Sequence, residues 1–303
     1  MSRARIGGKL SLPLTHGEVS LPAYRGRIAP TPTGEIHLGH ARTFHQAWRR
    51  AVAADGALIL RIEDLDPLRC RAEYTRQIID DLQWMGLRWT EGPTYQSQRS
   101  DVYRQVWLRL WDAGLIYPCH ATRKDVRDAA HAPHDDEEGA EPIFPPALRP
   151  PRGAERRYRE PHGVVWRFRV PDDESIRFDD VHQGRQSFTA GVDFGDFVVW
   201  RKDGVPAYEL AVVADDVDMQ ITEVVRGADL LKSTARQLLI YRALGASPPV
   251  WCHEALVRDA GGQRLAKRCQ ALSLRTLRER GLTWAQALAM AEAPQLGHSE
   301  SVS

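Results

Sequence analysis

The sequence predicts an α/β fold: a parallel sheet with crossover helices, interrupted by a smaller inserted α+β subdomain. Three observations lead to this fold class. Strand-type and helix-type segments alternate over residues 24–114, which is the rhythm of a parallel sheet. A proline-rich acidic stretch at residues 129–155 then breaks the rhythm. Strand and helix patterns resume after residue 190, so the interruption is an insertion rather than an end.

The first part of the chain gives the clearest elements. Apolar residues recur at helical spacing before Gly56 and again before Gly86, and both glycines are typical helix stops. Ser100 is the expected N-cap of a third helix. In chain order we expect strand 24–29, helix 38–55, strand 57–62 ending in a carboxylate cluster, helix 72–85 and helix 100–113.

The sequence after residue 128 contains loop, strand and helix patterns in a less regular order. Residues 129–155 read as a loop, and residues 163–171 and 174–188 as antiparallel strands of the inserted subdomain. Strand and turn patterns dominate residues 196–227. A capped helix is expected at Ser233–Leu244, a hairpin at 249–268 and a last helix at Thr283–Glu292. The expected division is a leader (1–23), a first core half (24–118), the inserted subdomain (119–190), a second core half (191–270) and a terminal helix and tail (271–303).

Composition bounds the class of protein. The 303 residues are 43% hydrophobic and 27% charged, which is ordinary for a globular chain. No apolar run approaches the ~20 residues of a membrane helix, so we expect no membrane association. The net charge of +1 neither indicates nor excludes a nucleic-acid partner. The four cysteines form no CxxC pair, which favours a reducing cytoplasm over a disulfide framework.

The stretch RIAPTPTGEIHLGH, residues 27–40, carries the first chemistry. A glycine-bearing loop that feeds a helix start offers free backbone N–H groups and the positive end of a helix dipole, which together seat a phosphate. Gly39 would let a ligand approach the backbone, and His37 and His40 could donate hydrogen bonds to the same phosphate. This arrangement suits nucleotidyl transfer. Two polar histidines on a helix surface are the alternative for this motif taken alone.

A second motif, RLAKR at Arg264–Arg268, follows a Gly-Gly turn. A basic loop can close on a triphosphate and neutralise the departing pyrophosphate, with Lys267 as the point charge. A solvated basic loop is the alternative. The pairing of the two motifs across an α/β pattern favours the nucleotide interpretation.

These motifs resemble the HIGH and KMSKS signatures of class I aminoacyl-tRNA synthetases. More narrowly, RIAPTPTGEIHLGHART, LRIEDLDPLR, YELAVVADD and VVRGADLLKSTARQLLIYRALG resemble, in order, the glutamyl-tRNA synthetase catalytic domain. The resemblance implies the Rossmann-like sheet of class I synthetases. It also implies ATP, complexed with Mg²⁺, and L-glutamate as substrates.

The resemblance carries over residue by residue. Glutamate binding falls on Arg27, Ile28, Ala29, Pro30, Thr31, Glu63, Tyr208 and Arg226; ATP binding falls on His37, Gly39, His40, Arg264 and Lys267; and catalysis falls on His37, His40 and Lys267. The chemistry agrees with this assignment, because two arginines can each grip a carboxylate while Glu63 faces the ammonium. A surface ion pair for Arg226 and a capping carboxylate for Glu63 are the alternatives. Asp64 and Asp66 read as structural.

Only about thirty-five residues follow Arg268, too few for an anticodon-binding domain. In this the chain resembles the truncated paralogues, the glutamyl-Q tRNA(Asp) synthetases. That resemblance implies glutamate activation without tRNA, followed by transfer of glutamate to queuosine in the anticodon loop of tRNA(Asp), by a monomer. Charging of tRNA(Glu) at its 3′ end and a non-catalytic glutamate or nucleotide binder are the alternatives.

The chain departs from the family pattern at three places. RLAKR has Arg264 and Ala266 where Lys and Ser are usual, so a hydroxyl is lost. Cys119 stands at the family zinc position, but Ala121 replaces the second cysteine, and His120, His131 and His134 have no clean ligand spacing. We therefore expect no family-type zinc site, with Cys119 as a buried thiol. The acidic loop is an insertion, and the nearby arginines with Tyr158 could contact RNA or form a solvated face.

Overall fold

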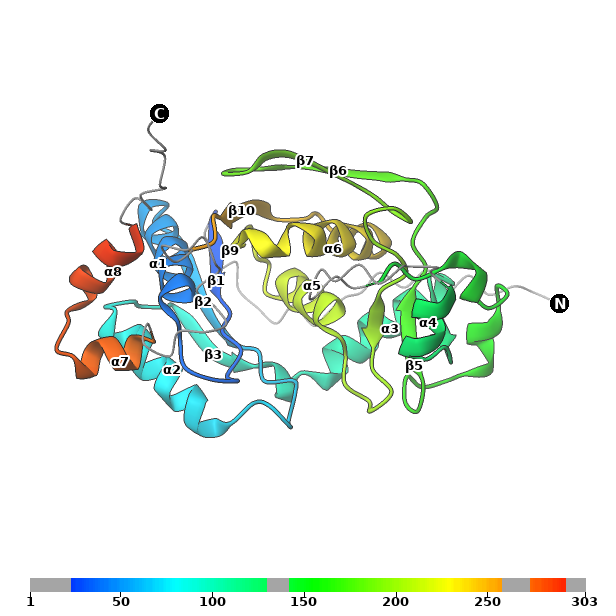
Figure 1. Cartoon of the computed structure of the whole chain (residues 1–303), viewed down its shortest axis with the longest axis horizontal. Helices are drawn as coiled ribbons and strands as arrows, with labels where there is room; N and C mark the ends of the chain where they lie inside the picture. Colours follow the sequence, from blue (N-terminus) through cyan, green and yellow to red (C-terminus); the bar gives the residue numbers. More distant parts are fainter. Residues whose placement is uncertain (1–22, 130–141, 258–272, 293–303) are drawn as a thin grey trace, which may run out of the picture.

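Parallel strands form the centre of the molecule. The computed structural model describes residues 23–129, 142–257 and 273–292. One parallel sheet has the order β1-β2-β3, and a second has the order β7-β6-β10-β9 with β6, β10 and β9 parallel. The backbone N–H of Thr222 donates to the carbonyl of Arg25 at 2.9 Å, so the two sheets meet where β9 lies beside β1 (Figure 1). The strands are β1 (Arg25–Ile28), β2 (Ala57–Ile62), β3 (Glu91–Tyr95), β6 (Ser175–Asp180), β7 (Gly184–Thr189), β9 (Glu223–Gly227) and β10 (Val250–Glu254). The predicted α/β fold with a parallel sheet is confirmed.

Helices predicted from apolar periodicity lie close to their expected places. Gly86 ends α2 with a left-handed φ of 76°, a conformation that favours glycine. The prediction that Ser100 caps α3 is wrong by one residue, because Arg99 occupies the N-cap position and Ser100 is already helical. α6 likewise begins two residues before Ser233. The helices are α1 (Leu38–Ala53), α2 (Ala72–Trp84), α3 (Ser100–Asp112), α4 (Arg123–Ala129), α5 (Tyr208–Asp218), α6 (Leu231–Leu244), α7 (Leu274–Glu279) and α8 (Trp284–Glu292).

The strand-and-turn prediction for residues 196–227 is wrong in its middle part, which forms helix α5. Every residue from Glu209 to Asp216 is buried. A helix that is buried on all sides has no polar face, so its apolar residues do not recur at 3.6-residue spacing. A run such as LAVVA then looks like a buried strand, which explains the error.

A third sheet, antiparallel with the order β4-β5-β8, forms the smaller lobe at the right of Figure 1. Its strands are β4 (Ile116–Cys119), β5 (Val165–Phe168) and β8 (Val198–Trp200). The expected antiparallel partners are therefore divided: β5 lies in this sheet, whereas the β6–β7 hairpin joins β10 through Asp180 and Trp251 and runs over α6. The predicted hairpin at 249–268 supplies β10, and residues 258–272 lie outside the described part of the chain.

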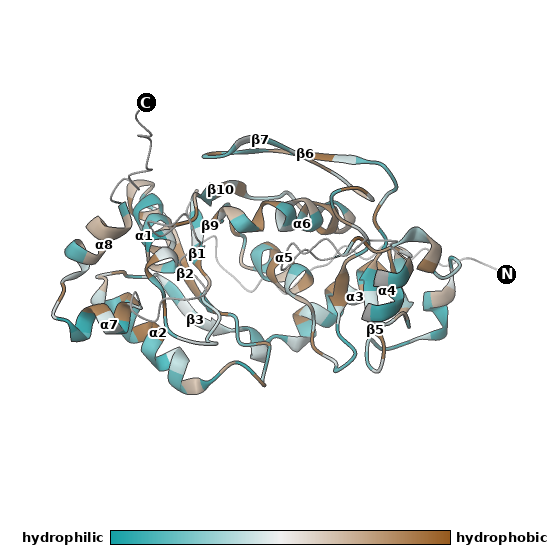
Figure 2. Ribbon diagram, in the orientation of Figure 1, coloured by the Kyte–Doolittle hydropathy of each residue, from teal (hydrophilic) through white to brown (hydrophobic). Residues whose placement is uncertain are grey.

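Two large apolar cores support these sheets. One packs β1 and β2 against α1 and α2, with Ile28, Leu60 and Leu82 fully buried. The other packs α3, α5 and α6 against the antiparallel sheet around Trp107 and Trp166. Figure 2 shows the central strands mostly brown or pale and the outer helix α4 mostly teal. Within the described ranges, the helices are too short or too polar to cross a membrane.

Candidate functional site

A cavity of about 690 Å³ opens at the carboxyl ends of the parallel strands. Ligands of open α/β sheets bind at this edge, where loops from several strands converge. We call it the central cavity. Its lining includes ten residues singled out from the sequence: Arg27, Ala29, Pro30, Thr31, His37, Gly39, His40, Glu63, Tyr208 and Arg226.

One predicted glutamate-binding residue lies away from the central cavity. Ile28 is fully buried in the apolar core and does not line the central cavity, because alternate residues of a strand point to opposite faces. The assignment of Ile28 to glutamate binding stays a prediction, and the burial of its side chain leaves the backbone for such a contact. Arg264 and Lys267 lie outside the described residues.

The start of α1 places the two histidines of HLGH at the cavity. His37 is the N-cap residue, in extended conformation, and its side chain makes no capping hydrogen bond. Its Nδ1 is buried without a hydrogen-bond partner among the described residues. The rings of His37 and His40 are 6.3 Å apart, while Leu38 between them is buried in the core. The helix start therefore brings two imidazoles and N–H groups that have no intrahelical acceptor to the same side of the cavity.

Packing among the described residues does not require glycine at position 39. A Cβ atom built at this position would come no closer than 3.7 Å to Val257, which is ordinary van der Waals contact. The open space beside Gly39 belongs to the central cavity. Glycine here leaves room for a ligand to approach the helix backbone.

Arg27 is buried at the inner wall of the cavity. Its Nη1–H donates to the carbonyl of Val225 at 3.0 Å, and its Nε lies 3.8 Å from Oδ1 of Asp216. Burial lowers the pKa of Arg27, and Asp216 opposes this shift. A buried guanidinium that is only partly compensated attracts an anion strongly.

Arg226 is held by a chain of buried hydrogen bonds. Its Nε–H donates to Nε2 of His253 at 3.0 Å and its Nη2–H donates to Oγ1 of Thr234 at 2.7 Å. Burial, together with the charge of Arg226, lowers the pKa of His253 to about 4, so the imidazole is neutral. Its Nδ1–H therefore donates to Oδ2 of Asp180 at 2.6 Å. Trp251 adds an aromatic face 5.0 Å from the guanidinium.

Glu63 is a buried carboxylate of the cavity wall and directly follows the end of β2. Arg61, which is fully buried, donates to Oε1 of Glu63 at 3.1 Å and to Oδ1 of Asp216 at 2.6 Å. Burial raises the pKa of Glu63, and the positive charges of Arg61 and Arg27 oppose this. Glu63 is thus a buried carboxylate set directly beside the arginines of the cavity wall.

Tyr208 is the first residue of α5 and remains 40% exposed within the cavity wall. Burial raises the pKa of its hydroxyl to about 12, while the charge of Arg226 acts in the opposite direction. The hydroxyl is therefore protonated at neutral pH and can donate a hydrogen bond.

Several site residues were not identified from the sequence. Asp66, which read as structural, lines the central cavity and also accepts a hydrogen bond from the backbone N–H of Leu68. Arg69 and Asp229 also line it. The position of Asp66 after a predicted parallel strand was the available signal. Asp180 and His253, which hold Arg226, gave no signal because 73 residues separate them.

The family zinc position is not built as a metal site among the residues described. Cys119 is buried in a small apolar cluster with Tyr117, Val126 and Phe144. The one group of described residues with metal-ligand geometry lies elsewhere, at His182, Cys252 and Glu254. The described residues around Cys119 therefore offer no set of zinc ligands, while two further candidates, His131 and His134, lie outside the described part of the chain.

Comparisons with known proteins agree with this architecture. The chain is 46% identical over 268 residues to the glutamyl-Q tRNA(Asp) synthetase of Nitratidesulfovibrio vulgaris, covering 85% of this chain and 82% of that protein. It is 46% identical over 267 residues to the glutamyl-Q tRNA(Asp) synthetase of Symbiobacterium thermophilum, covering 84% and 81%.

A solved structure and a family model extend the comparison. The glutamate tRNA ligase of Elizabethkingia meningosepticum, in complex with its amino acid, superposes with a TM-score of 0.67 at 28% identity. That match covers 86% of this chain but 53% of the ligase, so the chain spans about half its length. The model of the class I tRNA synthetase (E and Q) catalytic domain matches residues 23–291. The chain therefore belongs to the class I tRNA synthetases of the glutamate and glutamine type.

Proposed function

We propose that this chain activates L-glutamate with ATP, without tRNA, and then transfers the glutamyl group to queuosine in the anticodon loop of tRNA(Asp). The observation that carries the activation step is the meeting of two buried arginines, the buried carboxylate of Glu63 and the start of α1 in the central cavity. The names of the relatives support the acceptor.

Glutamate recognition follows from complementary charge. Arg27 and Arg226 would each bind one carboxylate of the substrate, and Glu63 would bind its ammonium group. The anchoring of Arg226 by His253 and Thr234 supports this role, because a fixed guanidinium loses little freedom on binding. Tyr208 would add a neutral hydrogen-bond donor. Ala29, Pro30 and Thr31 would shape the wall beside the substrate.

Activation joins a carboxylate oxygen of glutamate to the α-phosphorus of ATP and breaks the bond to pyrophosphate. His37 and His40 would stabilise the charge that builds on the phosphate, together with backbone N–H groups at the start of α1. Gly39 would leave space for the adenosine. Mg²⁺ would accompany ATP and neutralise its phosphates. Arg264 and Lys267 keep their proposed role as contacts of the departing pyrophosphate.

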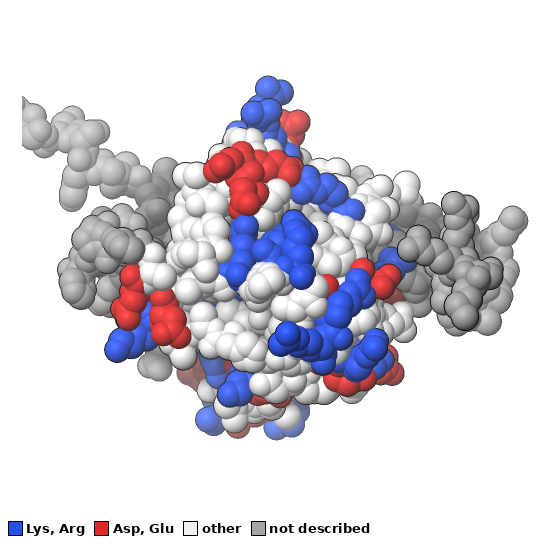
Figure 3. All heavy atoms as spheres, turned by 90° about the vertical axis from the view of Figure 1, so that its right-hand side faces the viewer, with Lys and Arg blue, Asp and Glu red and all other residues white. Residues whose placement is uncertain are grey.

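In the second step a nucleophile on queuosine attacks the acyl carbon and AMP leaves. Figure 3, which faces the α4 and β5 end of the molecule, displays Lys and Arg side chains gathered at its centre and lower right. Four exposed arginines of this lobe, Arg152, Arg156, Arg157 and Arg159, supply positive charge for a phosphate backbone. We propose that a monomer binds the anticodon loop here, in the cytoplasm.

The test is glutamate-dependent exchange between ATP and pyrophosphate in the absence of tRNA, with aspartate and glutamine as controls. We expect exchange with glutamate alone. Labelled glutamate should then enter tRNA(Asp) that contains queuosine, including tRNA whose 3′ diol has been oxidised by periodate. Exchange that requires tRNA(Glu), or labelling that periodate abolishes, would instead support 3′-end charging. No exchange under either condition would support a non-catalytic binder.

A further inference from the structure

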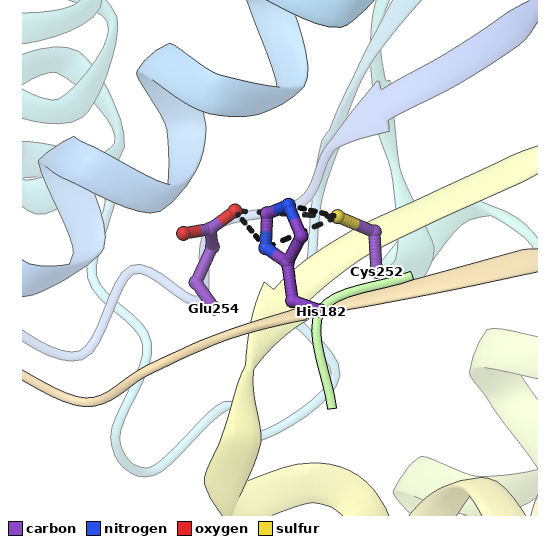
Figure 4. A group of neighbouring side chains, drawn as sticks. All are labelled: His182, Cys252 and Glu254. Atoms are coloured by element: carbon purple, nitrogen blue, oxygen red, sulfur yellow. Dashed lines mark hydrogen bonds and ion pairs between the residues drawn. The ribbon is translucent and has the colours of Figure 1, made fainter. Parts of the chain in front are cut away.

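We propose that Cys252, His182 and Glu254 bind a divalent transition-metal ion, with Zn²⁺ as the best match. We call these three residues the β10 cluster. Figure 4 shows the imidazole of His182 lying between the carboxylate of Glu254 and the sulfur of Cys252. The cluster is distinct from the family zinc position at Cys119 and does not depend on the function proposed above.

The distances suit a common ion. One ligand atom from each residue lies within 4.8 Å of the other two. Nδ1 of His182 is 3.0 Å from Oε1 of Glu254, and Sγ of Cys252 is 3.8 Å from that nitrogen and 4.0 Å from that oxygen. Zinc bonds of about 2.0–2.3 Å in tetrahedral geometry place ligand atoms about 3.3–3.6 Å apart. Shifts of a few tenths of an ångström would bring all three atoms onto one ion.

Two rigid ligands and one adjustable ligand make up the site. Cys252 and Glu254 are two residues apart on β10, so both side chains lie on the same face of the strand, and both are buried. The side chain of His182 is 38% exposed and follows the end of β6. Its Nδ1 and Nε2 are 3.8 and 3.9 Å from the sulfur, so a turn of the ring can aim either nitrogen at the ion. The exposed side of His182 also gives the ion a path from solvent.

The charges favour a divalent cation. A thiolate and a carboxylate give two negative charges, which one Zn²⁺ neutralises, while Cys252 releases one proton to solvent on binding. Arg42 lies 3.8 Å from Oε2 of Glu254, so it orients the carboxylate through the oxygen that does not face His182. Sulfur and imidazole ligands favour zinc over magnesium or calcium. Three protein ligands leave the fourth position for water.

The experiment uses the full chain after chelator treatment, in a thiol-free reductant. Co²⁺ serves as the spectroscopic probe, and we expect one equivalent to give the near-ultraviolet charge-transfer band of a cobalt–thiolate bond. Cys252→Ser should abolish the band. Matched changes at the other cysteines, Cys70→Ser, Cys119→Ser and Cys269→Ser, should each retain it. A band that survives in Cys252→Ser, or is absent from the unmodified chain, overturns the proposal.

Zn²⁺ affinity is then measured by competition with a chromophoric chelator. His182→Asn and Glu254→Gln should each weaken binding by about 10-fold or more, the loss expected even for groups that only orient a ligand. His182→Asn changes a partly exposed side chain, so it decides the question should Cys252→Ser fail to fold. Unchanged Zn²⁺ affinity in His182→Asn contradicts the assignment.

Discussion

Arg226 and His253 form a buried hydrogen bond in which Nε–H of the arginine donates to Nε2 of the imidazole at 3.0 Å. Because His253 is neutral and its Nδ1–H donates to Asp180, the ring can only accept from Arg226. Asp180 thus sets the tautomer of His253, and His253 sets the direction of Arg226. A substitution at Asp180 should therefore affect Arg226 through the tautomer of His253.

Asp180→Asn preserves the shape of the side chain but puts an N–H donor opposite Nδ1 of His253. The imidazole would then accept at Nδ1 and carry its proton on Nε2, where it would meet the donor of Arg226. We expect KM for glutamate to rise by about 10-fold, equivalent to about 1.4 kcal/mol, with KM for ATP little changed. Steady-state ATP–pyrophosphate exchange measures both constants. An equal rise in the two would contradict a specific effect on Arg226.

Gly39→Ala tests whether glycine at this position matters for stability or for ATP binding. A Cβ at this position meets Val257 at ordinary contact distance, and alanine favours a helix over glycine. The free energy of unfolding should therefore stay constant or rise by up to about 1 kcal/mol, as measured by urea denaturation. KM for ATP should nevertheless rise by about 10-fold or more. Unchanged ATP kinetics would mean that the space beside Gly39 is not used.

Glu63 should make glutamate binding sensitive to acid. Its pKa is raised above the ordinary 4.5, chiefly by burial. As pH falls through that raised value, the carboxylate gains a proton and loses the negative charge that we propose binds the substrate ammonium. KM for glutamate should thus increase at a higher pH than an ordinary carboxylate would allow. In Glu63→Gln, KM should be high throughout and lose this pH dependence; a retained profile would assign the titration to another group.

Arg61 is the cation that allows several carboxylates to be buried together. It contacts Glu63, Asp215 and Asp216 and is fully buried. Arg61→Met removes the cation that these three carboxylates share, although Arg99 still pairs with Asp215 and Arg27 with Asp216. The change should lower the free energy of unfolding by about 3–5 kcal/mol. The matched control is Arg185→Met, since Arg185 and its partner Asp179 are both more than 80% exposed, at 82% and 83%. That change should cost no more than about 1 kcal/mol. Equal losses in the two variants would exclude a special role for Arg61.

The exposed arginines of the smaller lobe should affect tRNA binding and not glutamate activation. Changing Arg157 and Arg159 together to Ala removes two exposed positive charges. We expect weaker binding of tRNA(Asp) and a shallower dependence of affinity on salt, because the logarithmic slope falls by about one for each phosphate that the protein no longer neutralises. ATP–pyrophosphate exchange should be unchanged. Arg49→Ala, on the distant helix α1, is the control and should alter neither quantity.

The residues that line the central cavity could be predicted from the sequence better than the buried residues that hold them in place. α1 and α2 could be predicted because each has one apolar face, whereas α5 could not because it is buried on all sides. The lining residues lie in short motifs beside strand ends, so adjacent residues share one place. The residues that support the cavity wall from behind are not close in sequence. Arg61 and Asp216, for example, are 155 positions apart, and such pairs form only when the chain folds.

The two faces of strand β10 contribute side chains to two different sites. The rings of Trp251 and His253 stack on one face, beside Arg226, while Cys252 and Glu254 share the other. A slip of one residue in the pairing of β10 would exchange the two faces, moving a thiol and a carboxylate toward the arginine and an imidazole toward His182. Insertions or deletions within these five residues should therefore be tolerated far less well than substitutions, since no single compensating change could restore both sides.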